Sequence, residues 1–440
     1  MTDRTPGPRY AWYVAFVLMV ATVSGMVDRY IMSLLVIPIE HDLAIGDAQM
    51  SYLIGASFYV LFSILGVPIG RLADRSSRRN IMAVGVALWS LFTMLCSTAH
   101  SYRALLGYRV GVGIGEATLI APSISLLADY FPREKLGRAM SVFTIGVFFG
   151  AGMAYFLGAW IVGLVPSQGV LAFPILSSMR PWQAVFFIVG LPGLAISLLL
   201  LTVREPRRQA SGAAQVPWRV VLAYVSANRR AFLLQTLAFT ASSTVNNGLA
   251  AWVAPFFVRT YDWSISDAGK VQGILTMSLG VLAVVAGGWL ADRYVRRGAI
   301  DGPLRVGMIG AAGMLVAATA FPLMPTASLA VACLAVVNVF AALPWGAAQA
   351  AAAEIIPAPL RAQGVALYFL IFNLVSFSLG PSSVAWLTEY FFHDEHAVRY
   401  SLAIVNVLGM TTALALFALS RPAYRRIVAQ REEILASLSS

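Results

Sequence analysis

The chain contains about twelve helix-length stretches of almost uninterrupted apolar residues, and this feature limits its possible folds more than any other. A helix needs roughly 20 apolar residues to cross a bilayer core of about 30 Å. These stretches are too long and too uniformly apolar for barrel strands, and hydrocarbon tolerates no unpaired backbone groups. We therefore predict an all-α polytopic membrane protein with twelve transmembrane helices, over residues 10–39, 48–71, 80–99, 102–128, 137–164, 183–203, 231–258, 268–291, 304–323, 328–353, 362–390 and 399–419.

The composition excludes the main soluble alternatives. Hydrophobic residues make up 59% of the 440 residues and charged residues only 12%, whereas a soluble domain carries about 25% charged residues. A soluble enzyme, a disordered scaffold and a disulfide-stapled secreted domain are therefore excluded. Cys96 and Cys333 both lie inside apolar stretches, so we expect neither a disulfide framework nor a thiolate metal site. The first apolar run is far too long for the h-region of a signal peptide.

The net charge of +11 comes from short loops and not from one basic face, so it indicates orientation in a membrane and not nucleic-acid binding. With the N-terminus inside, the inner segments hold 24 of the 31 Lys and Arg residues and the outer segments hold five. The positive-inside rule then predicts two cytoplasmic termini and an even number of helices. We expect a multi-pass protein of the inner or plasma membrane. The outer five are Arg103, Arg180, Arg259, Lys270 and Arg399, and Arg29 and Arg109 lie within spans.

An internal repeat divides the chain into two halves. GRLADRSSRR at 70–79 and GWLADRYVRR at 288–297 each follow the second span of a half, and their matching positions are offset by 218 residues. Duplicated halves are typical of transporters with a site near the membrane midplane. We predict a first six-helix bundle over 1–203, a cytoplasmic linker with an interfacial helix over 204–230, and a second six-helix bundle with a short cytoplasmic tail over 231–440.

These repeated motifs resemble the signature loop of the major facilitator superfamily, Gly-x-x-x-Asp-Arg-x-x-Arg-Arg. The resemblance implies two pseudo-symmetric bundles that rock about a central cavity, with Asp74 and Asp292 tethering the bundles on the inner side. A carboxylate beside a helix N-terminus and guanidiniums gains charge-assisted hydrogen bonds, which bias a two-state equilibrium if they form in one state only. The residues assigned to this conformational gate are Gly70, Asp74, Arg75, Arg78, Arg79, Gly288, Asp292, Arg293, Arg296 and Arg297.

A narrower resemblance is to the Spinster branch, whose members transport sphingosine phosphate and lysophospholipids. It rests mainly on the first half of the chain. The matching segments are VDRYIM in the first predicted helix, ALWSL in the third, RVGVGIGEAT in the fourth, FFIVGLPGL in the sixth and REPRR just after it.

Four ionisable residues lie well inside predicted spans: Asp28, Arg29, Arg109 and Glu116. Each such charge costs at least about 2.5–3.5 kcal/mol to insert, so a function is the default interpretation. A spacing of seven places Arg109 and Glu116 on nearly the same helix face, about 10 Å apart along the axis. We predict that Asp28 and Glu116 bind protons, that Arg109 holds one of them ionised, and that Arg29 pairs with Glu116 or a substrate phosphate. The alternative is a set of internal ion pairs that locks the bundle.

Three glycines, Gly111, Gly113 and Gly115, precede Glu116. A nucleotide-binding loop needs a preceding strand and different spacing, so that interpretation is rejected. Small residues let membrane helices approach closely, and we predict this role here and for the glycines at 146, 150, 152 and 158.

The second half offers neutral polar and aromatic groups. Ser242, Ser243, Thr244, Asn246 and Asn247 cluster in one span, and aromatic residues cluster around 368–377. Charges in one half and amides with aromatics in the other suit an amphipathic substrate. The alternatives are ordinary helix packing for the aromatics and interhelical hydrogen bonds for the amides. The predicted substrate-binding residues are Arg29, Glu116, Ser243, Asn246, Asn247, Asn338, Phe369, Phe372 and Asn373.

The preferred functional hypothesis is a proton-coupled secondary transporter of a lysophospholipid or sphingoid phosphate, working by alternating access. The alternatives are a proton-coupled organic-anion symporter or drug exporter of the same superfamily, and a non-transporting membrane sensor. We expect no enzyme activity, cofactor, metal or nucleic-acid partner. The expected partners are the substrate, protons and membrane lipids, and the expected state is a monomer.

Overall fold

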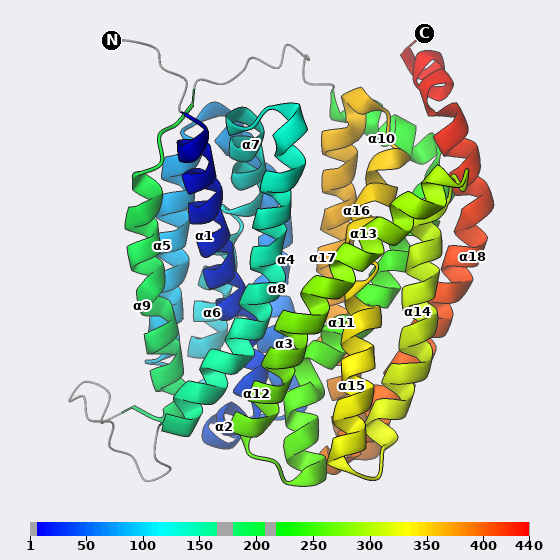
Figure 1. Cartoon of the computed structure of the whole chain (residues 1–440). Coiled ribbons are helices and arrows are strands. Elements are labelled where there is room, and N and C mark those ends of the chain that lie inside the picture. Colours follow the sequence, from blue (N-terminus) through cyan, green and yellow to red (C-terminus); the bar gives the residue numbers. More distant parts are fainter. Residues whose placement is uncertain (1–6, 165–178, 207–216, 440) are drawn as a thin grey trace. The chain divides into compact units, whose positions relative to one another are not determined.

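The computed structural model describes residues 7–164, 179–206 and 217–439, and its regular structure in these ranges is helical, as predicted (Figure 1). The first helices are α1 (Pro8–Leu34), α2 (Val36–Leu43), α3 (Asp47–Ile54), α4 (Ala56–Arg75), α5 (Arg78–Cys96), α6 (Tyr102–Glu116), α7 (Ile120–Tyr130), α8 (Arg133–Leu164) and α9 (Pro181–Leu201). They are followed by α10 (Trp218–Ala227), α11 (Arg229–Tyr261), α12 (Ile265–Leu275), α13 (Val281–Arg296), α14 (Gly302–Ala320), α15 (Ala327–Ala342), α16 (Trp345–Glu354), α17 (Arg361–Trp386) and α18 (Val398–Ser439).

Eleven stretches of the described chain are long and apolar enough to cross a membrane. They correspond to eleven of the twelve predicted spans. The remaining predicted span, 231–258, lies in α11, which is one continuous helix of 33 residues. Its lower apolarity follows from the polar side chains between Ser242 and Asn247. The all-helical membrane fold is therefore confirmed, and eleven of the twelve predicted spans meet the length and apolarity of a membrane crossing within the described residues.

Four predicted spans are interrupted, which the apolar pattern did not indicate. The breaks fall at Leu35, at Gly55, between α6 and α7, and between α15 and α16. Three of these breaks precede a proline by one to three residues: the break at Leu35 precedes Pro38, the α6–α7 break precedes Pro122, and the α15–α16 break begins just before Pro344. A proline has no N–H for the carbonyl four residues earlier, and its ring clashes with that carbonyl, so these breaks have a local cause. Broken helices at membrane depth are a common feature of transporter binding sites.

Contacts divide the chain into two compact units. The first unit contains Met1–Ser211, Val253–Val258 and Asp262–Met277, and the second contains Gly212–Trp252, Arg259–Tyr261 and Ser278–Ser440. The domain boundaries expected from the sequence stay a prediction.

In the first unit α8 packs against both α1 and α12, and α5 packs against α6 and α9 (Figure 1). Glycines permit the closest approach. A Cβ atom added to Gly152 of α8 would lie 2.8 Å from the carbonyl oxygen of Gly273 in α12, and one added to Gly273 would lie 2.8 Å from that of Gly152. The predicted packing role of the glycines in this span is confirmed at this contact.

In the second unit α14 packs against α15 and α18, and a buried cluster of Ala291, Val306, Leu343 and Ala347 joins α13, α14 and the α15–α16 region. The linker helix α10 packs on α17 and α18. Its Tyr224 hydroxyl donates to the Ile355 carbonyl oxygen at 2.7 Å. The linker residues 207–216 lie outside the described residues, and α18 continues as a helix well beyond its predicted end at 419.

Candidate functional site

The four predicted membrane-embedded charges all lie in the first unit, two on α1 and two on α6. Asp28 and Arg29 occupy consecutive positions near the end of α1, whereas Arg109 and Glu116 are two turns apart on α6. The side chain of Arg29 is 9% exposed, and the other three residues are at most 2% exposed. The four charges are therefore largely removed from bulk solvent and depend on neighbouring groups for their stability.

Glu116 and Arg29 form the central ion pair of this cluster. Arg29 Nε donates to Glu116 Oε2 at 2.5 Å. The sequence predicted either Glu116 or a substrate phosphate as the partner of Arg29. A Cβ atom added to Gly25, one turn before Arg29, would lie 3.4 Å from the same Oε2 atom, so the absence of a side chain at Gly25 gives the carboxylate room. Glu116 is also the last residue of α6, where the chain turns before α7. Its Oε1 atom has no hydrogen-bond partner among the described residues.

Three aromatic rings of α4 lie beside the Arg29 guanidinium. Its Cζ atom lies 4.5 Å from the ring centroid of Phe62, 5.1 Å from that of Phe58 and 5.7 Å from that of Tyr59. The Cζ atom of Arg109 lies 5.3 Å from the same Phe58 ring. Aromatic faces attract cations by about 2 kcal/mol when the cation is desolvated, so α4 supplies a wall that stabilises both arginines without neutralising them.

Arg109 binds backbone carbonyls and not a carboxylate. Its NH1 atom donates to the carbonyl oxygen of Asp28 at 3.2 Å, and its Nε atom donates to that of Leu53 at 3.4 Å. Leu53 lies at the end of α3, where the break at Gly55 interrupts the regular helical bonding. Arg109 thus joins the broken α3–α4 helix to α1. Within the described residues it makes no ion pair with Glu116, as the seven-residue spacing indicated.

Asp28 differs from Glu116 in its surroundings. Neither carboxylate oxygen of Asp28 has a partner at hydrogen-bond distance among the described residues, although the buried hydroxyl of Thr93 faces it. No Lys, Arg or His nitrogen of the described chain lies within 4 Å of it as an ion-pair partner. The two carboxylates are therefore inequivalent, because one is neutralised by a guanidinium and the other is not.

The first motif loop carries a second charged cluster at the start of α5. Arg78 is 3% exposed, and it donates to Asp129 at 2.6 Å and to Glu205 at 2.8 Å. Glu205 also accepts from the backbone N–H of Arg79. Burial alone would raise the pKa of Glu205, but these hydrogen bonds outweigh it and hold the pKa below its usual range. The cluster ties α5 to α7 and to the segment after α9.

The remaining motif residues are less enclosed. The Asp74 side chain lies outside the described residues. Asp292 on α13 is exposed, and the Arg293 guanidinium lies 5.0 Å from the ring centroid of Trp289. A Cβ atom added to Gly70 or Gly288 would meet no other described atom within 4 Å, so the present conformation does not itself require glycine at these positions.

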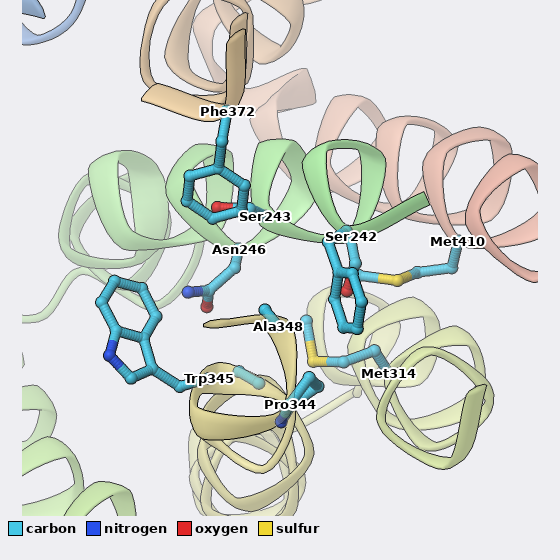
Figure 2. Close-up of a pocket in the computed structure, with 11 residues that line it drawn as sticks. Ser242, Ser243, Asn246, Met314, Pro344, Trp345, Ala348, Phe372 and Met410 are labelled. Carbon is cyan, nitrogen blue, oxygen red and sulfur yellow. The ribbon is translucent and has the colours of Figure 1, made fainter. Parts of the chain in front are cut away.

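A pocket in the second unit collects part of the predicted substrate-binding set (Figure 2). Its polar side chains, Ser242, Ser243 and Asn246, come from α11. Figure 2 shows the Asn246 amide pointing into the hollow between the rings of Trp345 and Phe372. The other lining residues are Phe239, Met314, Ala341, Pro344, Ala348 and Met410. A mainly apolar hollow with a few polar groups on one wall can hold an amphipathic ligand.

Several predicted residues lie outside this lining. Asn247 and Asn338 donate within their own helices, to the carbonyl oxygens of Ser243 and Leu334. Phe369 packs on Tyr368 and Phe372, and Asn373 is half-buried on the same helix. Sequence reasoning missed Trp345, Met314 and Met410, because an apolar residue in an apolar span carries no signal. Pro344, beside Trp345, was the one sequence feature that indicated the break between α15 and α16, where the Trp345 ring lines the pocket.

Comparisons with known proteins agree with this architecture. The family model described as Major Facilitator Superfamily matches residues 17–300. An MFS-type efflux pump of Mycolicibacterium smegmatis is 27% identical over 430 residues, which cover 96% of this chain and 95% of the pump. Protein spinster of Drosophila melanogaster is 26% identical and the human Protein spinster homolog 1 is 29% identical, over 73% and 72% of this chain. The matched stretches span only 51% and 61% of those two animal proteins.

The solved structures give the same fold. A bacterial homologue of the human lysosomal transporter Spinster, in an inward-facing and unoccupied conformation, superposes with a TM-score of 0.80 at 22% identity, covering 98% of this chain and 99% of that one. A D-xylose–proton symporter superposes with a TM-score of 0.71 at 18% identity, covering 92% of this chain and 97% of that one.

Proposed function

The chain belongs to the Major Facilitator Superfamily of membrane transporters, and within that family we propose that it is a proton-coupled carrier of an amphipathic, lipid-like substrate. It is a Spinster-like secondary transporter and not an enzyme. The substrate class that we propose is a lysophospholipid or a sphingoid phosphate, which combines an anionic head with an apolar tail.

The inequivalence of Asp28 and Glu116 is the observation that carries the proton coupling. A buried carboxylate without a counter-ion is most cheaply accommodated with a proton bound, whereas one held by a guanidinium is stable as an anion. A proton that binds Glu116 would weaken its ion pair with Arg29 and free a guanidinium within an aromatic wall. That guanidinium can then take a substrate phosphate by a bidentate contact. Proton binding and headgroup binding would thus use the same arginine in turn.

The pocket in the second unit supports the amphipathic substrate. Ser242, Ser243 and Asn246 offer hydrogen bonds, while Trp345 and Phe372 offer apolar surface. We propose that this pocket contributes to substrate binding. For the motif loops, we propose that Asp74 and Asp292 make state-dependent contacts that bias the conformational equilibrium, with Arg78 fixing the loop before α5.

The test is flux of a fluorescent lysophospholipid in proteoliposomes, with and without an imposed pH gradient. Glu116→Gln and Asp28→Asn keep the side-chain shape but cannot carry the ionised charge. We expect each variant to lose most of the stimulation by the gradient, by about 100-fold, which is the lower end of the range for losing a positioned proton-transfer group. Asp42→Asn is the control, since Asp42 is a carboxylate of the same unit that binds Arg180 and Trp182 outside the cluster.

A structural ion-pair lock predicts a different outcome. If Glu116 and Arg29 only stabilise the bundle, the double variant Glu116→Gln/Arg29→Gln should show gradient-driven flux like the wild type, provided that the double variant folds. Full gradient stimulation in Glu116→Gln and in Asp28→Asn would overturn the coupling proposal.

The second candidate is a drug exporter, which the similarity to the mycobacterial efflux pump over 96% of the chain favours. In that case an ethidium-type dye would be transported in the same vesicles and the lysophospholipid would not. The coupling residues would be shared, so the substrate panel separates the two candidates.

A further inference from the structure

The second unit contains a cluster of arginines that the transport proposal does not use. Asp301, just before α14, is fully buried, with 0% of its side chain exposed. Its Oδ1 atom accepts from Arg305 Nε at 3.1 Å. Its Oδ2 atom accepts from Arg421 Nε at 2.6 Å and from Arg425 NH2 at 2.9 Å. Burial alone would raise the pKa of Asp301, but the hydrogen bonds from Arg421 and Arg425 outweigh it and lower the pKa, so the carboxylate is ionised at neutral pH.

The cluster has more positive charge than its one carboxylate can balance. Three guanidiniums share one anionic charge, which leaves a formal excess of two. Among the described residues each of these arginines makes its ion pair with Asp301 alone, through a single nitrogen. The side chains of Arg305, Arg421 and Arg425 are 36%, 32% and 45% exposed, so each of them is partly accessible from outside. The Arg305 guanidinium also lies 5.6 Å from the ring centroid of Tyr294. One arginine would suffice to neutralise Asp301, and the other two offer unused donors that can bind an anion.

The position of the cluster indicates which anion it meets. Arg305 lies in the first turn of α14, and Arg421 and Arg425 lie one turn apart near the end of the α18 span, Glu395–Gln430. The helices α14 and α18 pack together, so the guanidiniums sit at the border of two membrane-length helices. Val295, Ile300 and Leu419 nearby in the sequence are 47%, 45% and 55% exposed. Basic sites at the ends of membrane helices beside apolar surface are suited to phospholipid head groups.

We infer that Arg305, Arg421 and Arg425 form a binding site for the phosphate of an anionic phospholipid, such as phosphatidylglycerol, on the exposed surface of the second unit. Asp301 holds the three guanidiniums in a fixed arrangement, and the excess charge attracts the phosphate. The acyl chains lie on the exposed apolar surface beside it. This site is separate from the pocket of Figure 2, with which it shares no lining residue.

The test measures binding of short-chain phosphatidylglycerol and phosphatidylcholine to the full-length protein in detergent, by native mass spectrometry. We expect the wild type to prefer phosphatidylglycerol. Since each arginine near a membrane surface contributes about a fivefold gain in affinity for anionic lipid, Arg425→Gln should reduce the preference about fivefold and Arg421→Gln/Arg425→Gln about 30-fold. The double variant keeps Arg305 on Asp301, and thermal unfolding reports whether it folds. If the double variant does not fold, the preference of Arg425→Gln for phosphatidylglycerol decides the test.

Arg426→Gln is the matched control, because Arg426 is adjacent to Arg425 but, among the described side chains, donates to Gln430 at 3.3 Å and not to Asp301. It should keep the full preference for phosphatidylglycerol. Equal binding of the two lipids by the wild type would overturn the inference, as would an unchanged preference in a folded variant of Arg425. Inorganic phosphate that displaces phosphatidylglycerol at equal concentration would also overturn it, since the site would then bind a free anion and not a lipid.

Discussion

At the scale of single residues, the glycines before Glu116 determine how closely α6 approaches its neighbours. A Cβ atom added to Gly113 would lie 2.6 Å from the backbone carbonyl oxygen of Phe58, and backbone cannot move aside cheaply. We therefore expect Gly113→Ala to lower the free energy of unfolding by about 1–3 kcal/mol through overpacking. Thermal unfolding of the purified protein in detergent measures this.

The same helix supplies the control for that prediction. Gly107 has no described atom within 4 Å of an added Cβ, so Gly107→Ala should be neutral or slightly stabilising, by up to about 1 kcal/mol. An equal loss in both variants would mean that helix geometry, and not contact with Phe58, sets the cost.

The charged residues show what the sequence can and cannot predict at this scale. Four ionisable residues in apolar spans stand out without a structure, and the seven-residue spacing correctly keeps Arg109 from pairing with Glu116. The bond from Arg109 to the Leu53 carbonyl was not predictable, because it depends on the break at Gly55, and a single glycine in a membrane helix more often serves packing. The Arg29–Glu116 pair could be named only as one option, since pairing depends on how two distant helices are rotated.

At the scale of helices, Arg78 links three segments of the first unit through Glu205 and Asp129. Glu205→Gln leaves the buried guanidinium with one carboxylate, so we expect a loss of about 1–3 kcal/mol in the free energy of unfolding at pH 7. The folded-state pKa of Glu205 is lowered, so its contribution is complete above the unfolded pKa of about 4.3 and is lost as the pH falls through the folded value.

The measurement is the difference in unfolding free energy between the wild type and Glu205→Gln, at pH 7 and at successively lower pH. The difference should shrink below about pH 4.3. Glu395→Gln is the control, because Glu395 is 66% exposed and the distance from its Oε2 atom to Arg259 Nε is 3.6 Å, which is longer than a hydrogen bond. A pH-independent difference for Glu205→Gln would show that lost packing, and not lost charge, explains the effect.

Helix positions were predictable because membrane thickness fixes the length of an apolar span. The interruptions were not, since hydropathy is averaged over a window and hides a single proline. Pro38, Pro122 and Pro344 were visible in the sequence, yet prolines are also tolerated inside membrane helices, as Pro68 and Pro192 are here. The proline alone therefore does not separate a kink from a break.

At the scale of the whole molecule, the repeat predicts equivalent loops but not equivalent chemistry. In the first unit a buried cation at the start of α5, Arg78, binds Glu205 after α9. In the second unit a buried anion before α14, Asp301, binds Arg421 and Arg425 on α18. In each unit an ion pair thus joins the third membrane helix of the predicted half to the last one. The third helix carries the cation in the first unit, whereas the anion precedes the third helix in the second unit. Sequence similarity between the halves does not reveal such an exchange, because the repeat matches Arg78 to Arg296, whereas the buried anion Asp301 lies outside the repeated motif.

Orientation in the membrane is the remaining whole-molecule property that the charge distribution predicts. We propose that both termini are cytoplasmic, because 24 Lys and Arg residues lie on one side of the predicted spans and five on the other. In a variant with Cys96 and Cys333 replaced by alanine, Ser226→Cys on α10 and His100→Cys after α5 each place one exposed thiol. A membrane-impermeant maleimide should label His100→Cys in intact cells and Ser226→Cys only after permeabilisation. The reverse pattern would invert the proposed topology. Labelling of both in intact cells would contradict the three predicted spans between residues 100 and 226, which place the two positions on opposite sides of the membrane.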